Sequence, residues 1–121
     1  MPRIMVAKDN IISSMDLEEL LSARGHQVVG VAASGMEAVH MGETLSPDLI
    51  VTEINMPGTM VGVAAAEAIR STRDIPIFFL MGDAREELVN RARRMTPYGL
   101  IRKPFGEEQV AEAINAAFAG S

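Results

Sequence analysis

The sequence predicts an α/β domain built on a doubly wound, five-stranded parallel sheet with helices on both faces. Five short apolar runs alternate with five amphipathic segments, and this alternation is typical of parallel strands joined by right-handed crossover helices. The strand candidates are nearly continuous apolar runs, as expected for strands that are buried on both faces. With 121 residues, 48% of them hydrophobic, the chain is long enough for one core. We therefore expect residues 1–121 to form a single domain.

The first strand is expected at residues 4–7, a run of four apolar residues. Asp9 or Asn10 follows and can cap a helix, because short polar side chains accept hydrogen bonds from the free N–H groups of a first turn. Gly25 is the expected end of that helix. Residues 27–33, which are rich in valine, then form the second strand.

The second helix is expected to begin after Ser34, another capping residue. The third strand follows a turn at Pro47, takes its apolar residues from 49–51 and brings the carboxylate of Glu53 to its end. Residues 56–58, Met-Pro-Gly, then break the chain. A strand that ends in an acid and a turn presents that acid in the crevice at the carboxyl edge of an open sheet.

The third helix is expected over residues 64–69 and should close near Ser71. The fourth strand is expected at 75–80, with Pro76 near its start, where proline is tolerated. Asp83 is the expected cap of the fourth helix.

The fifth strand is short, residues 100–101, and the Lys-Pro-Phe sequence at 103–105 ends it. The last helix is expected from 107 to about 119. Its first two residues are acids, which suit the positive end of a helix.

The composition excludes several classes of function. A net charge of −5 argues against nucleic-acid binding, which requires a basic patch. The chain has no cysteine, so disulfides and thiolate metal sites are excluded. No apolar run approaches the roughly 20 residues needed to span a bilayer, and residues 1–3 lead into a strand rather than a signal peptide. We expect a cytoplasmic protein that binds neither nucleic acid nor membrane.

Charged side chains follow several of the predicted strands at the edge where doubly wound sheets carry their sites. Two acids and two lysines converge there and indicate a functional site. The plainer alternatives are solvated charges at strand ends, a helix-capping role for Asp9, and a purely structural ion pair for Lys103. The residues at these strand ends are Lys8, Asp9, Glu53, Met81, Gly82 and Lys103.

At these residues the chain resembles the receiver domain of two-component response regulators, the CheY-like family, over essentially its whole length. The matching segments are residues 4–9, 47–58, 75–77 and 103–105, in order and at the expected separations. The resemblance implies a flavodoxin-like fold with five helices and the strand order 2-1-3-4-5. Residues 58–62 and 96–99 are similar to receivers found beside sensor histidine kinases. Because the sequence ends just after the last expected helix, we expect either a stand-alone regulator or a fragment of a larger kinase or regulator.

The resemblance also implies a role for each site position. In the family, an aspartate accepts a phosphoryl group from a histidine kinase, and two acids and a backbone carbonyl hold Mg²⁺. A hydroxyl and a lysine contact the phosphoryl group, and an aromatic side chain swings inward when the residue with the hydroxyl moves. Carried over by position, these are Glu53 as acceptor, Lys8 and Asp9 as the acid pair, Asn55 as the carbonyl, Met81 as the hydroxyl, Lys103 as the lysine and Leu100 as the switch aromatic.

Four of these positions depart from the family pattern. Glu53 is one methylene longer than aspartate, which displaces its carboxylate from the in-line geometry of phosphoryl transfer. Lys8 places an ammonium where the family has an acid, Met81 cannot donate a hydrogen bond, and Leu100 has no ring. The metal positions Asp9, Glu53 and Asn55 thus predict a weak or lost Mg²⁺ site.

Charge counting supports the same interpretation. Asp9 and Glu53 face Lys8 and Lys103, which leaves the site neutral without a metal ion. We therefore expect Lys8 or Lys103 to pair with Glu53 in place of Mg²⁺. Glu53 is compatible both with natural divergence and with an engineered mimic of phosphoaspartate.

Three functions follow from this sequence. The first is a signalling module that binds a partner and is not phosphorylated in the usual way. The second is a working Mg²⁺-dependent phosphoacceptor, and the third is a small-ligand binder at the vacated pocket. The expected partner is a histidine kinase or another signalling protein, bound by the surface of helix four, strand five and helix five. Arg91, Arg93 and Arg94 lie on that helix, and arginine is enriched at interfaces.

Overall fold

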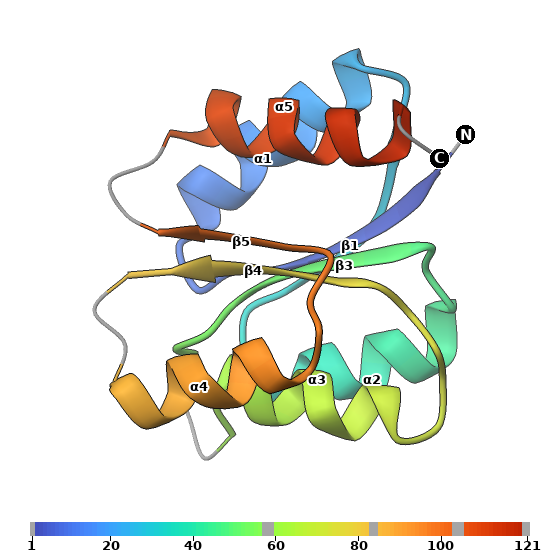
Figure 1. Ribbon diagram of the computed structural model, residues 1–121. Helices are drawn as coiled ribbons and strands as arrows, with labels where there is room; N and C mark the ends of the chain where they lie inside the picture. Colours follow the sequence, from blue (N-terminus) through green and yellow to red (C-terminus); the bar gives the residue numbers. More distant parts are fainter. Residues whose placement is uncertain (1, 57–59, 83–84, 103–105, 120–121) are drawn as a thin grey trace.

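A computed structural model describes residues 2–56, 60–82, 85–102 and 106–119. Five parallel strands form one sheet in the order β2-β1-β3-β4-β5, which confirms the predicted fold and strand order (Figure 1). The elements in chain order are β1 (Arg3–Ala7), α1 (Ile11–Ala23), β2 (Gln27–Ala32), α2 (Gly35–Leu45), β3 (Leu49–Glu53), α3 (Gly62–Arg70), β4 (Ile77–Met81), α4 (Glu86–Arg94), β5 (Gly99–Arg102) and α5 (Glu107–Ala119).

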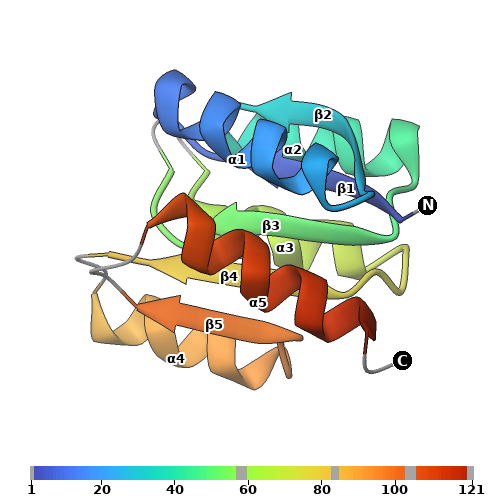
Figure 2. The ribbon, with the colours of Figure 1, turned by 90° about the horizontal axis from the view of Figure 1, so that it is seen from above.

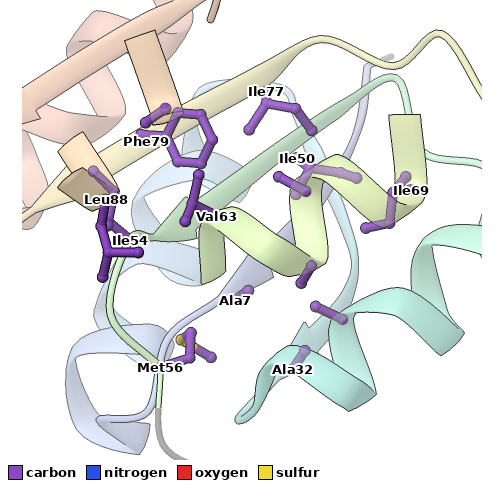
Figure 3. Close-up of a cluster of buried hydrophobic side chains, with 14 of the residues drawn as sticks. Ala7, Ala32, Ile50, Ile54, Met56, Val63, Ile69, Ile77, Phe79 and Leu88 are labelled. Carbon is purple, nitrogen blue, oxygen red and sulfur yellow. The ribbon is translucent and has the colours of Figure 1, made fainter. Parts of the chain in front are cut away.

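The helices lie in two layers, with α1 and α5 on one face of the sheet and α2, α3 and α4 on the other (Figures 1 and 2). Side chains alternate between these layers along each strand, because successive residues of a strand point to opposite faces. In β1, Ile4 and Val6 enter the cluster under α1 and α5. Met5 and Ala7 enter the cluster under the other three helices, part of which is drawn in Figure 3.

The strand register determines which residues meet at the carboxyl edge of the sheet. Ala7 at the end of β1 lies opposite Thr52 of β3, so Lys8 and Asp9 leave β1 beside the end of β3. Glu53 lies opposite Leu80 of β4. The parallel register therefore brings the segment after β1 next to Glu53.

The first two helices, α1 and α2, each begin after a polar residue that caps the first turn. The side chain of Asn10 accepts a hydrogen bond from the Ser13 N–H at 3.1 Å, and Ser34 accepts one from the Glu37 N–H at 3.2 Å. Asn10, rather than Asp9, is thus the cap of α1. Gly25 ends the helix region with a φ of 87°, a conformation that favours glycine.

The fourth strand begins later than its apolar run suggests. The sequence predicts a strand from residue 75, whereas β4 begins at Ile77. Proline has no N–H to donate to a neighbouring strand, and Pro76 contributes only its carbonyl, which accepts a hydrogen bond from the Ile50 N–H at 3.0 Å. The strand also ends one residue later than predicted, so Met81 is its last residue rather than the residue after it.

The start of α4 also differs from the prediction. The helix begins at Glu86, and Arg85 occupies the capping position without a side-chain cap hydrogen bond. Asp83, the predicted cap, lies outside the described residues. Two acids in the first turn, Glu86 and Glu87, favour the positive end of the helix dipole.

His26 is a buried polar residue, with 5% of its surface exposed. Its Nε2 lies 3.2 Å from the Oδ1 of Asn115, and its ring packs against Phe118 with centroids 5.3 Å apart. The contact joins the end of α1 to α5. In the described part of the chain, none of the helices has the length and apolar character needed to cross a bilayer.

Candidate functional site

The site lies where β1 and β3 end, at one edge of the sheet. Glu53 is the last residue of β3 and is partly buried. One of its carboxylate oxygens, Oε1, accepts a hydrogen bond from the backbone N–H of Asp9 at 3.1 Å. Two of the acids predicted from the sequence are thus brought together.

Burial and the neighbouring Asp9 set the electrostatics of Glu53. Burial of Glu53 and the hydrogen bond from its carboxyl to that of Asp9 raise the pKa of Glu53, and the negative charge of Asp9 acts in the same direction. The Asp9 N–H and the charge of Lys8 act to lower it, but the pKa remains above its ordinary value of 4.5. Two like charges close together disfavour ionisation, so Asp9 adds to the effect of burial on Glu53.

The backbone of Glu53 is held by a close approach of α3. A Cβ added to Gly62, the first residue of α3, would lie 1.7 Å from the carbonyl oxygen of Glu53 and 3.0 Å from the Oγ1 of Thr52. Only glycine permits that distance. Gly62 therefore positions the strand end that carries the acid, a role that its place in the sequence does not reveal.

Lys8 forms an ion pair with Glu107, the first residue of α5. The Lys8 Nζ lies 2.9 Å from the Glu107 Oε1, and the two side chains are 4% and 23% exposed. Burial alone would raise the pKa of Glu107. The hydrogen bond and charge of Lys8, the Glu107 N–H and the hydroxyl of Ser13 outweigh this effect and hold the pKa below its ordinary value.

The sequence predicts that Lys8 or Lys103 pairs with Glu53. For Lys8 the ion pair that is observed is a different one, and Lys103 lies outside the described residues. The ammonium of Lys8 forms its ion pair with Glu107, and its charge acts on Glu53 as well. Glu107 was not among the predicted site residues. Its only sequence signal is its position as one of two acids at a helix start, which the helix dipole explains equally well.

The two positions that correspond to the family's hydroxyl and aromatic side chains hold aliphatic core residues. Met81 is 2% exposed and belongs to the cluster under α2, α3 and α4. Leu100 is partly buried against the same cluster and lies opposite Phe79 in the β4–β5 register. Neither side chain has a hydrogen-bond donor.

The structure does not test the other two predicted positions, Asn55 and Lys103. Asn55 is exposed, and Lys103 lies outside the described residues. Within the described ranges, no group of three or more His, Cys, Asp or Glu side chains is arranged to hold a metal ion. A hard cation such as Mg²⁺ prefers oxygen ligands, and here Lys8 replaces one acid and turns to Glu107. One acid of the family's Mg²⁺-binding pair is therefore replaced by a cation, and the carboxylates of Asp9 and Glu53 are the ones that remain at these positions.

Comparison with known proteins identifies the class. Residues 4–115 match the response regulator receiver domain, so the chain belongs to this family. It is a CheY-like receiver domain with a flavodoxin-like fold, the class used in two-component signal transduction.

Curated relatives and solved structures support this assignment. The chain is 36% identical over 115 residues to the transcriptional regulatory protein PdtaR of Mycobacterium tuberculosis, covering 95% of this chain and 56% of that protein. It is 29% identical over 114 residues to the chemotaxis protein CheY of Thermotoga maritima, covering 93% and 94%. The signal receiver domain of a modulated diguanylate cyclase from Desulfovibrio desulfuricans superposes with a TM-score of 0.85 at 28% identity, over 99% of this chain and 95% of that chain.

The chain spans about half the length of two of these relatives. It covers 56% of PdtaR and 42% of the phyllosphere-induced regulator PhyR of Methylorubrum extorquens. The similarity to these two proteins therefore concerns the receiver part. Receiver domains interact with histidine kinases and other signalling proteins.

Proposed function

We propose that this receiver domain is a signalling module that binds a partner protein and does not depend on phosphorylation of Glu53. The observation that carries the proposal is the buried ion pair of Lys8 with Glu107, which occupies a position where phosphoryl transfer in this family needs a metal-binding acid. Without a divalent cation, the charge that develops on a transferred phosphoryl group is not neutralised.

The aliphatic side chains of Met81 and Leu100 support the same conclusion. Met81 is buried in the core and offers no donor to a phosphoryl oxygen. Leu100 packs against the same core cluster and has no ring to reorient. A phosphoryl group on Glu53 would thus meet neither the hydroxyl nor the aromatic switch of the family.

The proposed partner surface comprises α4, β5 and α5. Arg93 and Arg94 at the end of α4 are exposed, as is Arg102 at the end of β5. Tyr98, just before β5, is a large hydrophobic side chain with 48% exposure. Exposed arginine and tyrosine are typical of protein interfaces. We include in the proposal that residues 1–121 act as one domain without enzymatic activity of their own.

A second candidate is a working phosphoacceptor, and the contact of Asp9 with Glu53 favours it. Two carboxyl groups in contact lose their mutual repulsion when a cation binds between them. Mg²⁺ is often held by one or two carboxylates and several waters. This function would require both residues to turn toward the metal ion.

The intact mass of the protein after treatment with acetyl phosphate and Mg²⁺ distinguishes the two candidates. The proposal expects no phosphoryl adduct on the wild-type chain. The triple variant Lys8→Asp, Glu53→Asp, Met81→Thr restores the family's acid pair, acceptor and hydroxyl and serves as the positive control. An adduct on the wild-type chain that disappears in Glu53→Ala would overturn the proposal and establish the second candidate.

A further inference from the structure

A continuous series of contacts joins Glu53 to the first turn of α5. Glu53 holds the N–H of Asp9 at 3.1 Å. That N–H belongs to the peptide unit between Lys8 and Asp9, and a peptide unit is planar and rigid. The Lys8 side chain then reaches Glu107 at 2.9 Å. The contacts therefore run from the end of β3, through the end of β1, to the start of α5.

The burial of Lys8 favours keeping its ion pair with Glu107. An ammonium that is 4% exposed has little access to water, and breaking a buried ion pair is strongly destabilising. A shift of the Lys8–Asp9 peptide is thus carried to the first turn of α5.

The α1–α5 layer contains a second ion pair that does not involve the site. Arg24, at the end of α1, places its guanidinium 2.7 Å from the Oε1 of Glu108, and the two side chains are 23% and 64% exposed. This pair also reaches the first turn of α5. It has no contact with Glu53 or with the Lys8–Asp9 peptide among the described residues, and therefore provides a matched control.

We propose that Lys8 and Glu107 couple the Glu53 carboxylate to α5, with Glu107 as the positioning residue. The inference deepens the proposed function, on which it rests, by naming how an event at Glu53 reaches the partner surface. The hydroxyl and aromatic positions hold Met81 and Leu100, so the coupling runs through a pair of charges on the opposite face of the sheet. The event is a change of charge or contact at Glu53, such as a partner's cationic group placed against it.

Amide NMR spectra of the full chain test this coupling. The substitution Glu53→Gln removes the charge at the site and keeps an oxygen that accepts the Asp9 N–H. In the wild-type background, we expect it to shift the amide signals of Asp9 and of Glu108, Gln109 and Val110 in α5. In the Glu107→Gln background, the shifts in α5 are lost while the shift at Asp9 remains. Lys8→Met is a second background with the same expected result.

The control variant Arg24→Met should leave the α5 shifts caused by Glu53→Gln intact. Loss of the shifts in that background as well would mean that any loosening of α5 removes them, and would overturn the role of Glu107. Equal α5 shifts with and without Glu107, or no α5 shifts in the wild-type background, would also overturn it. None of these outcomes depends on a phosphoryl adduct, so the failure of this inference and the failure of the proposed function are distinguishable.

Discussion

The ammonium of Lys8 and the carboxylate of Glu107 lie 2.9 Å apart, although 99 residues separate them in the sequence. The pair crosses from the end of β1 to the start of α5 beside the Asp9–Glu53 contact. It uses a position that the family reserves for a metal-binding acid. A lysine that is ion-paired with α5 therefore stands at a position where the family has an acid that binds the metal ion.

Loss of Glu107 should lower the free energy of unfolding more than loss of Lys8, because Lys8 is the more buried member of the pair. Glu107→Gln removes the carboxylate that pairs with the buried Lys8 ammonium and should lower the free energy of unfolding by about 1–3 kcal/mol. Lys8→Met replaces the ammonium with an apolar group of similar length and leaves Glu107 partly solvated, so its cost should be smaller. Urea denaturation of both variants and of the double variant checks this. A larger loss for Lys8→Met than for Glu107→Gln would contradict it.

The stabilising contribution of the Glu107 carboxylate should be lost at acid pH. Its pKa is lowered in the folded state, so the folded protein binds that proton less readily than the unfolded chain does. The stability it contributes is complete above the ordinary carboxyl pKa of 4.5 and is lost as the pH falls through the lower pKa of the folded state. Denaturation curves from neutral pH downward should show a shallower acid loss for Glu107→Gln. A slope identical to that of the wild type would refute the prediction.

Glu53 should have the opposite effect. Its pKa is raised in the folded state, so its ionised form opposes folding above the ordinary value of 4.5, and this penalty grows as the pH rises through the raised pKa. Glu53→Gln should therefore be more stable than the wild type at neutral pH, and the difference should vanish toward acid pH. Glu19→Gln on α1, which neutralises an exposed acid, controls for the change in net charge. Urea midpoints of both variants at neutral and acid pH provide the comparison.

Gly62 should tolerate no side chain, because its added Cβ would lie 1.7 Å from the carbonyl oxygen of Glu53. Gly62→Ala has to displace the end of β3 and should cost more than about 2 kcal/mol. Gly106→Ala is the matched control, since nothing lies within 4 Å of its added Cβ. The melting temperatures of the two variants should differ by several degrees. Equal melting temperatures would show that the end of β3 moves at no cost and would contradict the prediction.

Local patterns were sufficient for most of the architecture. The apolar runs predicted five strands within one or two residues, and Asn10 and Ser34 predicted two helix starts, since both signals depend on neighbouring residues alone. The exceptions follow from contacts outside the local segment or from proline chemistry. β4 begins after Pro76, and His26 is buried by Asn115 and Phe118 of the distant helix α5.

The sequence by itself determined the fold class, the strand order through its family resemblance, and the convergence of Asp9 and Glu53 at one edge. It also determined the chemical identity of the altered positions Lys8, Met81 and Leu100. Only the tertiary structure decided that Lys8 turns to Glu107, that Asp9 holds Glu53, and that Gly62 fits against the strand end. The partner of a charge at a strand end depends on which helix packs beside it, and that choice is made by the packing of the two layers rather than by any local pattern.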